Sequence, residues 1–216
     1  MNIDENEFFR QATLRICGSL DVKKALSMAL NYLQEFIPID RIFLEIFDEE
    51  FQSMRTIVVV TAEGGIETDL LTPLSKEAKL LLRSLQPSID TVAVFSDPME
   101  NLIAREMLRF HGIQAASLMN MPLITESGRA GGLVFISESD KKHSQRHVDL
   151  MSLLIEPFTI AVSNALEHRE VLQIRKQLAE SNQYLKEELQ RESKTEIIGS
   201  DYGLKNVMTM VQQVAT

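Results

Sequence analysis

The sequence of 216 residues has no tryptophan, one cysteine and no run of about 18 apolar residues. A single cysteine excludes an intrachain disulfide and any zinc site built on clustered cysteines. We expect Cys17 to be a buried structural thiol, because Leu14, Ile16 and Leu20 surround it. The acidic N-terminus lacks the apolar core of a signal peptide, and no segment is long and apolar enough to span a bilayer. The sequence therefore predicts a cytoplasmic protein with no membrane partner.

Basic residues are too few and too scattered for a nucleic-acid-binding surface. Lysine and arginine number 22 against 31 aspartates and glutamates, which gives a formal net charge of −9. Phosphate contacts need clustered positive side chains, and no such run occurs in the sequence. The hydrophobic share of 44% is normal for a globular protein. The chain is long enough for one sizeable domain with additional elements or for two small domains.

The first part of the chain changes from helical to strand periodicity. Apolar residues at three- and four-residue spacings predict an amphipathic helix over 21–37. Alternation over 41–47 and a β-branched run over 56–61 predict two strands joined as an antiparallel hairpin. We expect Gly64 and Gly65 to end the second strand.

The middle of the chain returns to helical spacing before a second hairpin. A helix is predicted over 75–85, a short strand over 91–95, and another short helix after Pro98. The clearest local signal is a pair of apolar runs, 115–124 and 130–136, joined by a turn that contains glycine. This pattern predicts a second antiparallel hairpin.

The last part of the chain is helical, with no glycine or proline over 158–198. Residues 148–166 are rich in apolar side chains and should pack on a sheet, whereas 167–196 mixes charges of both signs and cannot be buried in one core. Pro157 should bend the helix, because it lacks the N–H that the preceding turn needs. We hypothesise that this bend separates the packed part from the linker part.

The charged segment has a heptad-like pattern with two interpretations. Ser181 and Glu188 are weak d positions, and the apolar a and d positions are Val171, Ile174, Leu178 and Leu185. A solvated single helix fits this pattern, and so does a dimeric coiled coil. An isolated charged helix of this length rarely holds alone, which favours a homodimer through the linker.

Three segments resemble GAF domains. The segment 19–48, SLDVKKALSMALNYLQEFIPIDRIFLEIFD, is similar to their first long helix and strand, and 112–137, GIQAASLMNMPLITESGRAGGLVFIS, to their closing hairpin. The segment 147–168, HVDLMSLLIEPFTIAVSNALEH, resembles the terminal helix that leads to an output domain. The resemblance implies an α+β fold with a central antiparallel sheet, flanking helices, a ligand pocket on one face and a long C-terminal linker helix.

The tail resembles a different family. Residues 197–216, IIGSDYGLKNVMTMVQQVAT, are similar to the opening of the AAA+ domain in bacterial sigma-54-dependent transcription activators, with Asp201 where serine is usual. No G-x-x-x-x-G-K-[ST] loop is present, so no ATP-binding residue carries over. The predicted organisation is a GAF-like sensory domain over 1–166, a helical coiled-coil linker over 167–196 and an AAA+ stub over 197–216. Contacts with sigma-54 RNA polymerase and DNA would be made only by domains absent from this chain.

The sequence contains no nucleophile elbow, phosphate loop or paired carboxylates, so we do not expect an enzyme. His143 and His147 lie four residues apart and could form a metal site with Glu138 or Asp140, but their polar surroundings favour a solvated face. His111 is expected to end a helix, where the dipole favours it. No metal is assigned, and the cofactor, if one exists, is unknown.

The GAF resemblance places the ligand pocket between the sheet and segments 62–75, 89–101 and 108–121. The residues expected to bind the ligand are Thr61, Ser96, Asp97, Arg109, His111, Ser117, Met119 and Asn120. One arginine with several neutral donors would suit a small organic anion or another small metabolite. Bilin attachment would need a cysteine in the pocket region, and Cys17 lies in the first helix.

The resemblances imply a regulatory module that senses a small molecule and controls an attached sigma-54-dependent AAA+ activator, itself an ATPase. One alternative is a GAF input domain of a signalling enzyme, such as a histidine kinase or a cyclase. The AAA+-like tail, which contains no phosphoacceptor histidine motif, argues against it. Another alternative is a degenerate pocket filled by its own side chains, which would leave a ligand-free dimerisation module.

Overall fold

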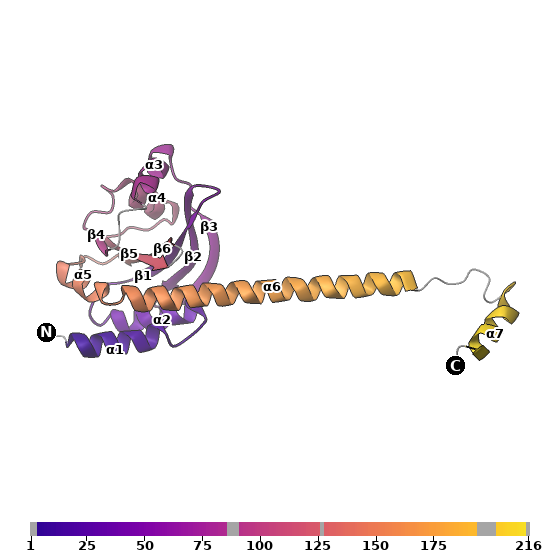
Figure 1. The fold of residues 1–216 in the computed structure, drawn as a ribbon. Helices are drawn as coiled ribbons and strands as arrows, with labels where there is room; N and C mark the ends of the chain where they lie inside the picture. The colour runs from indigo at the N-terminus through magenta and orange to yellow at the C-terminus, as the bar shows by residue number, and fades with distance from the viewer. Residues whose placement is uncertain (1–3, 86–90, 126–127, 194–201, 215–216) are drawn as a thin grey trace. The chain divides into compact units, whose positions relative to one another are not determined.

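The computed structural model describes residues 4–85, 91–125, 128–193 and 202–214. The chain divides into two compact units, Met1–His168 and Arg169–Thr216. The first unit is built on a six-stranded antiparallel sheet in the order β3-β2-β1-β6-β5-β4 (Figure 1). The strands are β1 (Arg41–Asp48), β2 (Ser53–Thr61), β3 (Gly64–Leu71), β4 (Ala93–Phe95), β5 (Ser117–Thr125) and β6 (Gly128–Ser137). The α+β class and both predicted hairpins are confirmed.

Helices cover both faces of this sheet. One face is covered by α1 (Glu5–Ile16), α2 (Val22–Leu33), α5 (Gln145–Ser152) and α6 (Ile155–Ser193) (Figure 1). The other face is covered by α3 (Lys76–Leu85) and α4 (Leu102–Phe110). Local signals fix several of these boundaries. Asp21 caps α2 by accepting from the Lys24 N–H at 3.1 Å, and Asn101 caps α4 by accepting from the Ala104 N–H at 3.0 Å.

The main core lies between the sheet and the layer of α1, α2, α5 and the first part of α6. Phe8, Leu30, Leu44, Phe135 and Phe158 are among its fully buried side chains. Burial of each such side chain contributes about 1.5–3 kcal/mol. This face therefore supplies most of the stability of the first unit.

A smaller apolar layer joins α4 to the opposite face of the sheet. Phe43 of β1 and Leu118 of β5 pack there with Leu108 of α4. The start of α3 is tied to α4, because the Glu106 carboxylate accepts a hydrogen bond from the Ser75 N–H at 2.7 Å. The two helices thus form a thin roof over the sheet.

The region after the first hairpin differs from the sequence prediction. The second strand ends at Thr61, just before Gly64 and Gly65, as predicted. The segment 62–75, which was expected to line the pocket, instead contains β3 (Gly64–Leu71), and this strand pairs along β2. Backbone pairing at the edge of the sheet needs no apolar alternation. Both polar and apolar side chains, such as Glu67, Asp69 and Ile66, remain exposed, so the strand has no regular alternation of buried and exposed residues.

The prediction of a buried thiol at Cys17 is wrong. Phe8, Ala12 and Ile16 form the buried stripe of α1, and Cys17 is the residue that follows its end. A helix turns about 100° per residue, so the position after Ile16 leaves the core. Cys17 is exposed.

The predicted bend near Pro157 is present, with α5 and α6 meeting at 55°. The break falls at Leu153 and Leu154, one turn before the proline, where the missing N–H and the ring prevent a continuous helix. The idea that this bend separates the packed part from the linker is wrong. Phe158 and Ala165 follow the bend and are still buried in the main core.

The second unit contains the remainder of α6 and α7 (Lys205–Val214). The described residues of α6 from Arg169 to Leu189 are exposed or half-buried, including apolar Leu178 and Leu185. Among the described residues no single helix is long and apolar enough to cross a membrane, although the bent pair of α5 and α6 meets the length and composition criteria together. The apolar residues of that pair include Leu150 and Phe158, which lie in the main core.

Candidate functional site: a cavity beneath α3 and α4

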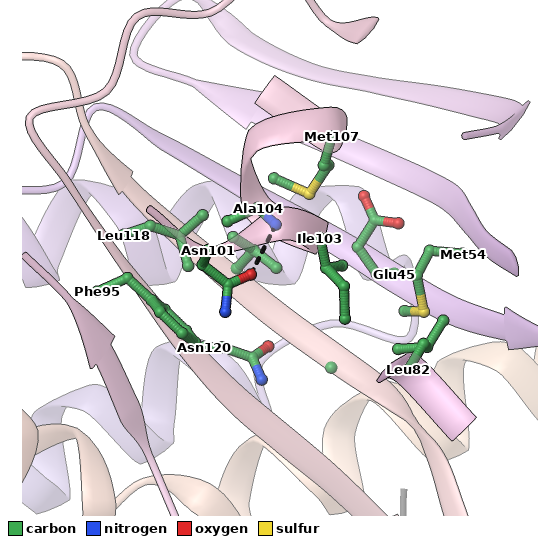
Figure 2. A pocket seen from close by; sticks show the side chains of 12 residues that line it. Glu45, Met54, Leu82, Phe95, Asn101, Ile103, Ala104, Met107, Leu118 and Asn120 are labelled. Carbon is green, nitrogen blue, oxygen red and sulfur yellow. Dashed lines mark hydrogen bonds between the residues drawn. The ribbon is translucent and has the colours of Figure 1, made fainter. Parts of the chain in front are cut away.

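A cavity of about 100 Å³ lies between the sheet and the roof formed by α3 and α4. Its walls are mostly apolar, and Figure 2 shows the lining side chains converging from strands and helices. The lining residues are Glu45, Met54, Leu82, Phe95, Asn101, Ile103, Ala104, Met107, Leu118, Asn120, Gly132 and Val134. An apolar cavity with a few polar groups is the usual form of a small-molecule site.

The carboxyl group of Glu45 is the principal polar feature of the cavity. The residue is only 1% exposed, and Oε1 accepts a hydrogen bond from the Thr56 hydroxyl at 2.7 Å. Oε2 is buried and has no hydrogen-bond partner among the described residues. Burial raises the pKa of Glu45 to about 7, against the opposing effect of the Thr56 hydrogen bond. Glu45 therefore changes its charge near neutral pH.

Thr56 connects Glu45 to His111. The Thr56 Oγ1 lies 3.3 Å from the His111 Nε2. Since the Thr56 proton is used towards Glu45, the hydroxyl oxygen is left to accept from a protonated Nε2. Burial lowers the pKa of His111, so the neutral imidazole is favoured in this arrangement. The three side chains form a directed chain from the end of α4 to the cavity.

Two amide side chains line the cavity on the side away from Met54 (Figure 2). The Oδ1 of Asn101 is committed to capping α4, which leaves its Nδ2 as a donor. The amide of Asn120 makes no hydrogen bond to other described residues, so it is available to a molecule in the cavity. The lining thus offers a carboxyl group and two amides.

The glycine pair of β6 keeps this region open. A Cβ at Gly132 would lie 3.1 Å from the Asn120 Oδ1, so any side chain there would crowd the cavity. At Gly131 the backbone has φ +153°, and a Cβ would lie 2.1 Å from the Glu45 carbonyl oxygen. Only glycine at Gly131 lets β6 pair closely with β1 beside Glu45.

The eight residues predicted to bind a ligand do not gather in one place. Only Asn120 lines the cavity. His111 reaches it indirectly through Thr56, and Arg109 is exposed on α4. Thr61 lies in a separate surface hollow with Asp40, Arg41 and Glu138, and Ser96 and Asp97 lie in another with Lys142.

Ser117 and Met119, which were expected to bind the ligand, do not line the cavity. Met119 and Met121 lie in the main core on the opposite face of the sheet. Ser117 is also buried, and its hydroxyl oxygen accepts from the His143 N–H at 2.9 Å. Side chains alternate along a strand, so Leu118 and Asn120 face the cavity instead.

The expectation that His143 is solvated is likewise wrong. The residue is 5% exposed, and the imidazole Nδ1 lies 2.8 Å from the Ser117 hydroxyl. Burial, and secondarily the nearby His147, lower the pKa of His143 to about 4. The side chain is therefore a neutral structural group that joins the start of α5 to β5.

Glu45 was missed by the sequence reasoning, although a signal was present. It is the one charged residue within the apolar alternation of 42–47. An ionisable side chain at the centre of a strand that is buried on both faces is costly, and such a position is a functional candidate.

Comparison with solved structures identifies the fold. The chromophore-binding domain of an unusual bacteriophytochrome from R. palustris aligns with a TM-score of 0.56 and 14% identity, covering 78% of this chain and 64% of that one. The phycoerythrobilin-bound GAF domain of a cyanobacterial phytochrome gives 0.54 and 17%, covering 78% and 100%. The GAF domain of an Acinetobacter phosphoenolpyruvate-protein phosphotransferase gives 0.53 and 13%, covering 79% and 99%. This chain folds as a GAF domain.

Sequence comparison shows a similarity between part of this chain and a transcription regulator. The formate hydrogenlyase transcriptional activator of Salmonella typhimurium, from strains SL1344 and LT2, is 29% identical over 106 residues, which are 48% of this chain. The match spans only 15% of the length of that activator. No protein-family profile matches the chain. The structural likenesses show the fold of the GAF domain and leave its ligand open.

Proposed function

We propose that this chain is the sensory part of a sigma-54-dependent transcription activator, in which a small molecule enters the Glu45 cavity and alters helix α6. The observation that carries the proposal is the cavity itself, because its lining combines apolar walls with a buried carboxyl group that lacks one partner. The relationship to a transcriptional activator and the AAA+-like segment 197–216 support the output side.

The sheet offers a short route from the cavity to α6. On β6, Gly132 and Val134 line the cavity, and the intervening Leu133 and the next residue, Phe135, face the main core. Phe135 packs edge-on against Phe158 of α6, with ring centroids 6.0 Å apart. A change in the position of β6 on one face is therefore felt by α6 on the other, because packed cores transmit small shifts.

A cavity-filling variant tests this proposal. In Ala104→Leu the added carbon atoms occupy most of the cavity, while Ala62→Leu makes the same change at an exposed position outside it. A panel of small amines, amides and carboxylates is screened by thermal shift on both variants and the wild type. We expect a stabilising compound to act on the wild type and Ala62→Leu only.

The same compound should change hydrogen exchange in residues 169–189, which report on α6 beyond the core. Failure of every compound to stabilise the wild type would contradict ligand sensing, and so would equal stabilisation of Ala104→Leu. Stabilisation without any change in α6 would contradict the proposed output.

A further inference from the structure

The unpaired oxygen of Glu45 constrains what the cavity can hold. Oε2 is buried and unpartnered among the described residues, while Oε1 is already paired with Thr56. A buried carboxyl oxygen without a donor is costly, so a molecule that supplies a donor at this point is favoured. For the ionised carboxylate, the missing interaction is therefore a hydrogen bond donated to Oε2.

The charge of the lining points to the same class of ligand. Of the described residues that line the cavity, Glu45 is the only ionisable one. Arg109, which was expected to meet an anion, is exposed on α4 and does not line the cavity. An anion would enter beside a carboxyl group with no cation to balance it, whereas a cation would neutralise the carboxylate.

We infer that the cavity binds a small cation with N–H groups, of the amine or amidine class, which donates a hydrogen bond to Oε2 of Glu45. This inference rests on the proposed ligand-sensing function and narrows its ligand. The far end of the molecule meets the amide of Asn120, whose Oδ1 can accept a hydrogen bond, and the apolar walls exclude water. Exclusion of water strengthens the attraction between the cation and the carboxylate. The hydrogen bonds to the ligand offset the free-energy cost of removing both charges from water.

Three molecules of the same shape test the inference. Acetamidinium, acetamide and acetate have the same size and differ in charge and in the number of N–H donors. Methionine methyl signals are followed by NMR on the full chain at constant ionic strength. Met54 and Met107 line the cavity, whereas Met119 and Met121 lie on the other face of the sheet and act as internal controls.

We expect acetamidinium to shift the Met54 and Met107 signals in a saturable manner, with a dissociation constant on the order of 1 mM. Acetamide should bind more weakly and acetate should not bind. Glu45→Gln should weaken acetamidinium binding about tenfold or more, and Glu50→Gln, the same change at an exposed turn, should not.

Binding should also depend on the charge of Glu45. The groups that face it are Thr56 on β2 and His111 at the end of α4. Burial lowers the pKa of His111, which favours its neutral form, while the pKa of Glu45 is raised to about 7. Acetamidinium should therefore bind about tenfold more tightly at pH 8 than at pH 6.

Equal or tighter binding of acetate or acetamide would overturn the inference, as would acetamidinium shifts at Met119 and Met121 as large as those at Met54 and Met107. The proposed sensing function survives this result if a compound from the screening panel still discriminates the wild type from Ala104→Leu. If no compound binds in either experiment, both the proposed sensing function and the inferred ligand class are contradicted. If Glu45→Gln does not fold, the affinities of the wild type for the three molecules still test the inference.

Discussion

At the scale of single residues, two buried ionisable groups give stability opposite dependences on pH. Glu45 has a pKa of about 7 against an ordinary value of 4.5, and His143 has a pKa of about 4 against 6.5. Glu45 stays protonated up to a higher pH in the folded state than in the unfolded chain. His143 stays neutral down to a lower pH in the folded state than in the unfolded chain. Between pH 4.5 and 6.5 the two effects oppose one another, so single variants are needed to see each.

Glu45→Gln isolates the first effect. The pKa of Glu45 is raised, so the wild type loses stability as pH increases from about 4.5 to about 7. The glutamine does not titrate. We expect the free energy of unfolding of the variant, relative to the wild type, to increase by about 3 kcal/mol across this interval. Urea denaturation at a series of pH values measures the difference, and a difference independent of pH would contradict the buried titration.

His143→Asn isolates the second effect, and asparagine keeps an acceptor for the Ser117 hydroxyl. The pKa of His143 is lowered, so the wild type loses stability as pH falls from about 6.5 to about 4. We expect the variant to gain about 3 kcal/mol relative to the wild type over that fall, in addition to any constant packing cost. The same denaturation series, compared with His168→Asn in the exposed part of α6, provides the measurement and its control.

At the scale of elements, the positions of glycine and proline decide how strands and helices meet. Gly131 allows β6 to approach β1 beside Glu45, and Pro157 lies in the first turn of α6. A proline in a first turn removes an N–H that would have no helical partner there, so it is tolerated. The bend between α5 and α6 is consequently compatible with a fully packed core on both sides.

Two substitutions in α6 compare the effect on stability of a proline in the first turn with that of a proline inside the helix. Pro157→Ala should change the free energy of unfolding by no more than about 1 kcal/mol, because the first turn makes no hydrogen bond at this N–H. Ile160→Pro, at a half-exposed position one turn later, should cost about 3 kcal/mol through a lost helical hydrogen bond and a steric clash. Thermal denaturation compares them, and similar losses for both would refute this account of the first turn.

At the scale of the whole molecule, the charged part of α6 is the candidate contact between two copies of the chain. Leu178 and Leu172 are both largely exposed, at 61% and 50%. Only Leu178 occupies an a position of the heptad pattern. The homodimer remains a prediction, and the two leucines provide a matched test of it.

Leu178→Glu should weaken dimerisation, whereas Leu172→Glu at an outer position should not. Each dimer buries two copies of Leu178, so the loss is about 3 kcal/mol or more, which is roughly a hundredfold in the dissociation constant. Sedimentation equilibrium of the full chain measures both variants. A wild type that is monomeric at micromolar concentration, or equal weakening by both substitutions, would refute the coiled-coil interpretation.

The sequence by itself determined the elements and their class. Apolar periodicity located the helices at 21–37 and 75–85 and the hairpin at 115–136, because the faces of these elements are buried in a regular pattern. It also predicted the bend near Pro157, since a missing N–H is a local property of the chain. It did not locate β3, whose stability comes from pairing with β2 and whose side chains are mostly exposed, the polar and the apolar ones alike.

The tertiary structure alone decided which face of each strand sees the cavity. Both faces of β5 are largely apolar, so alternation groups Met119 with Met121 and Leu118 with Asn120 without saying which pair faces α4. That choice depends on how far the helices of the two layers reach across the sheet, a property of residues distant in sequence. For the same reason, the central position of Glu45 in the cavity depends on the packing of α3 and α4 over the sheet.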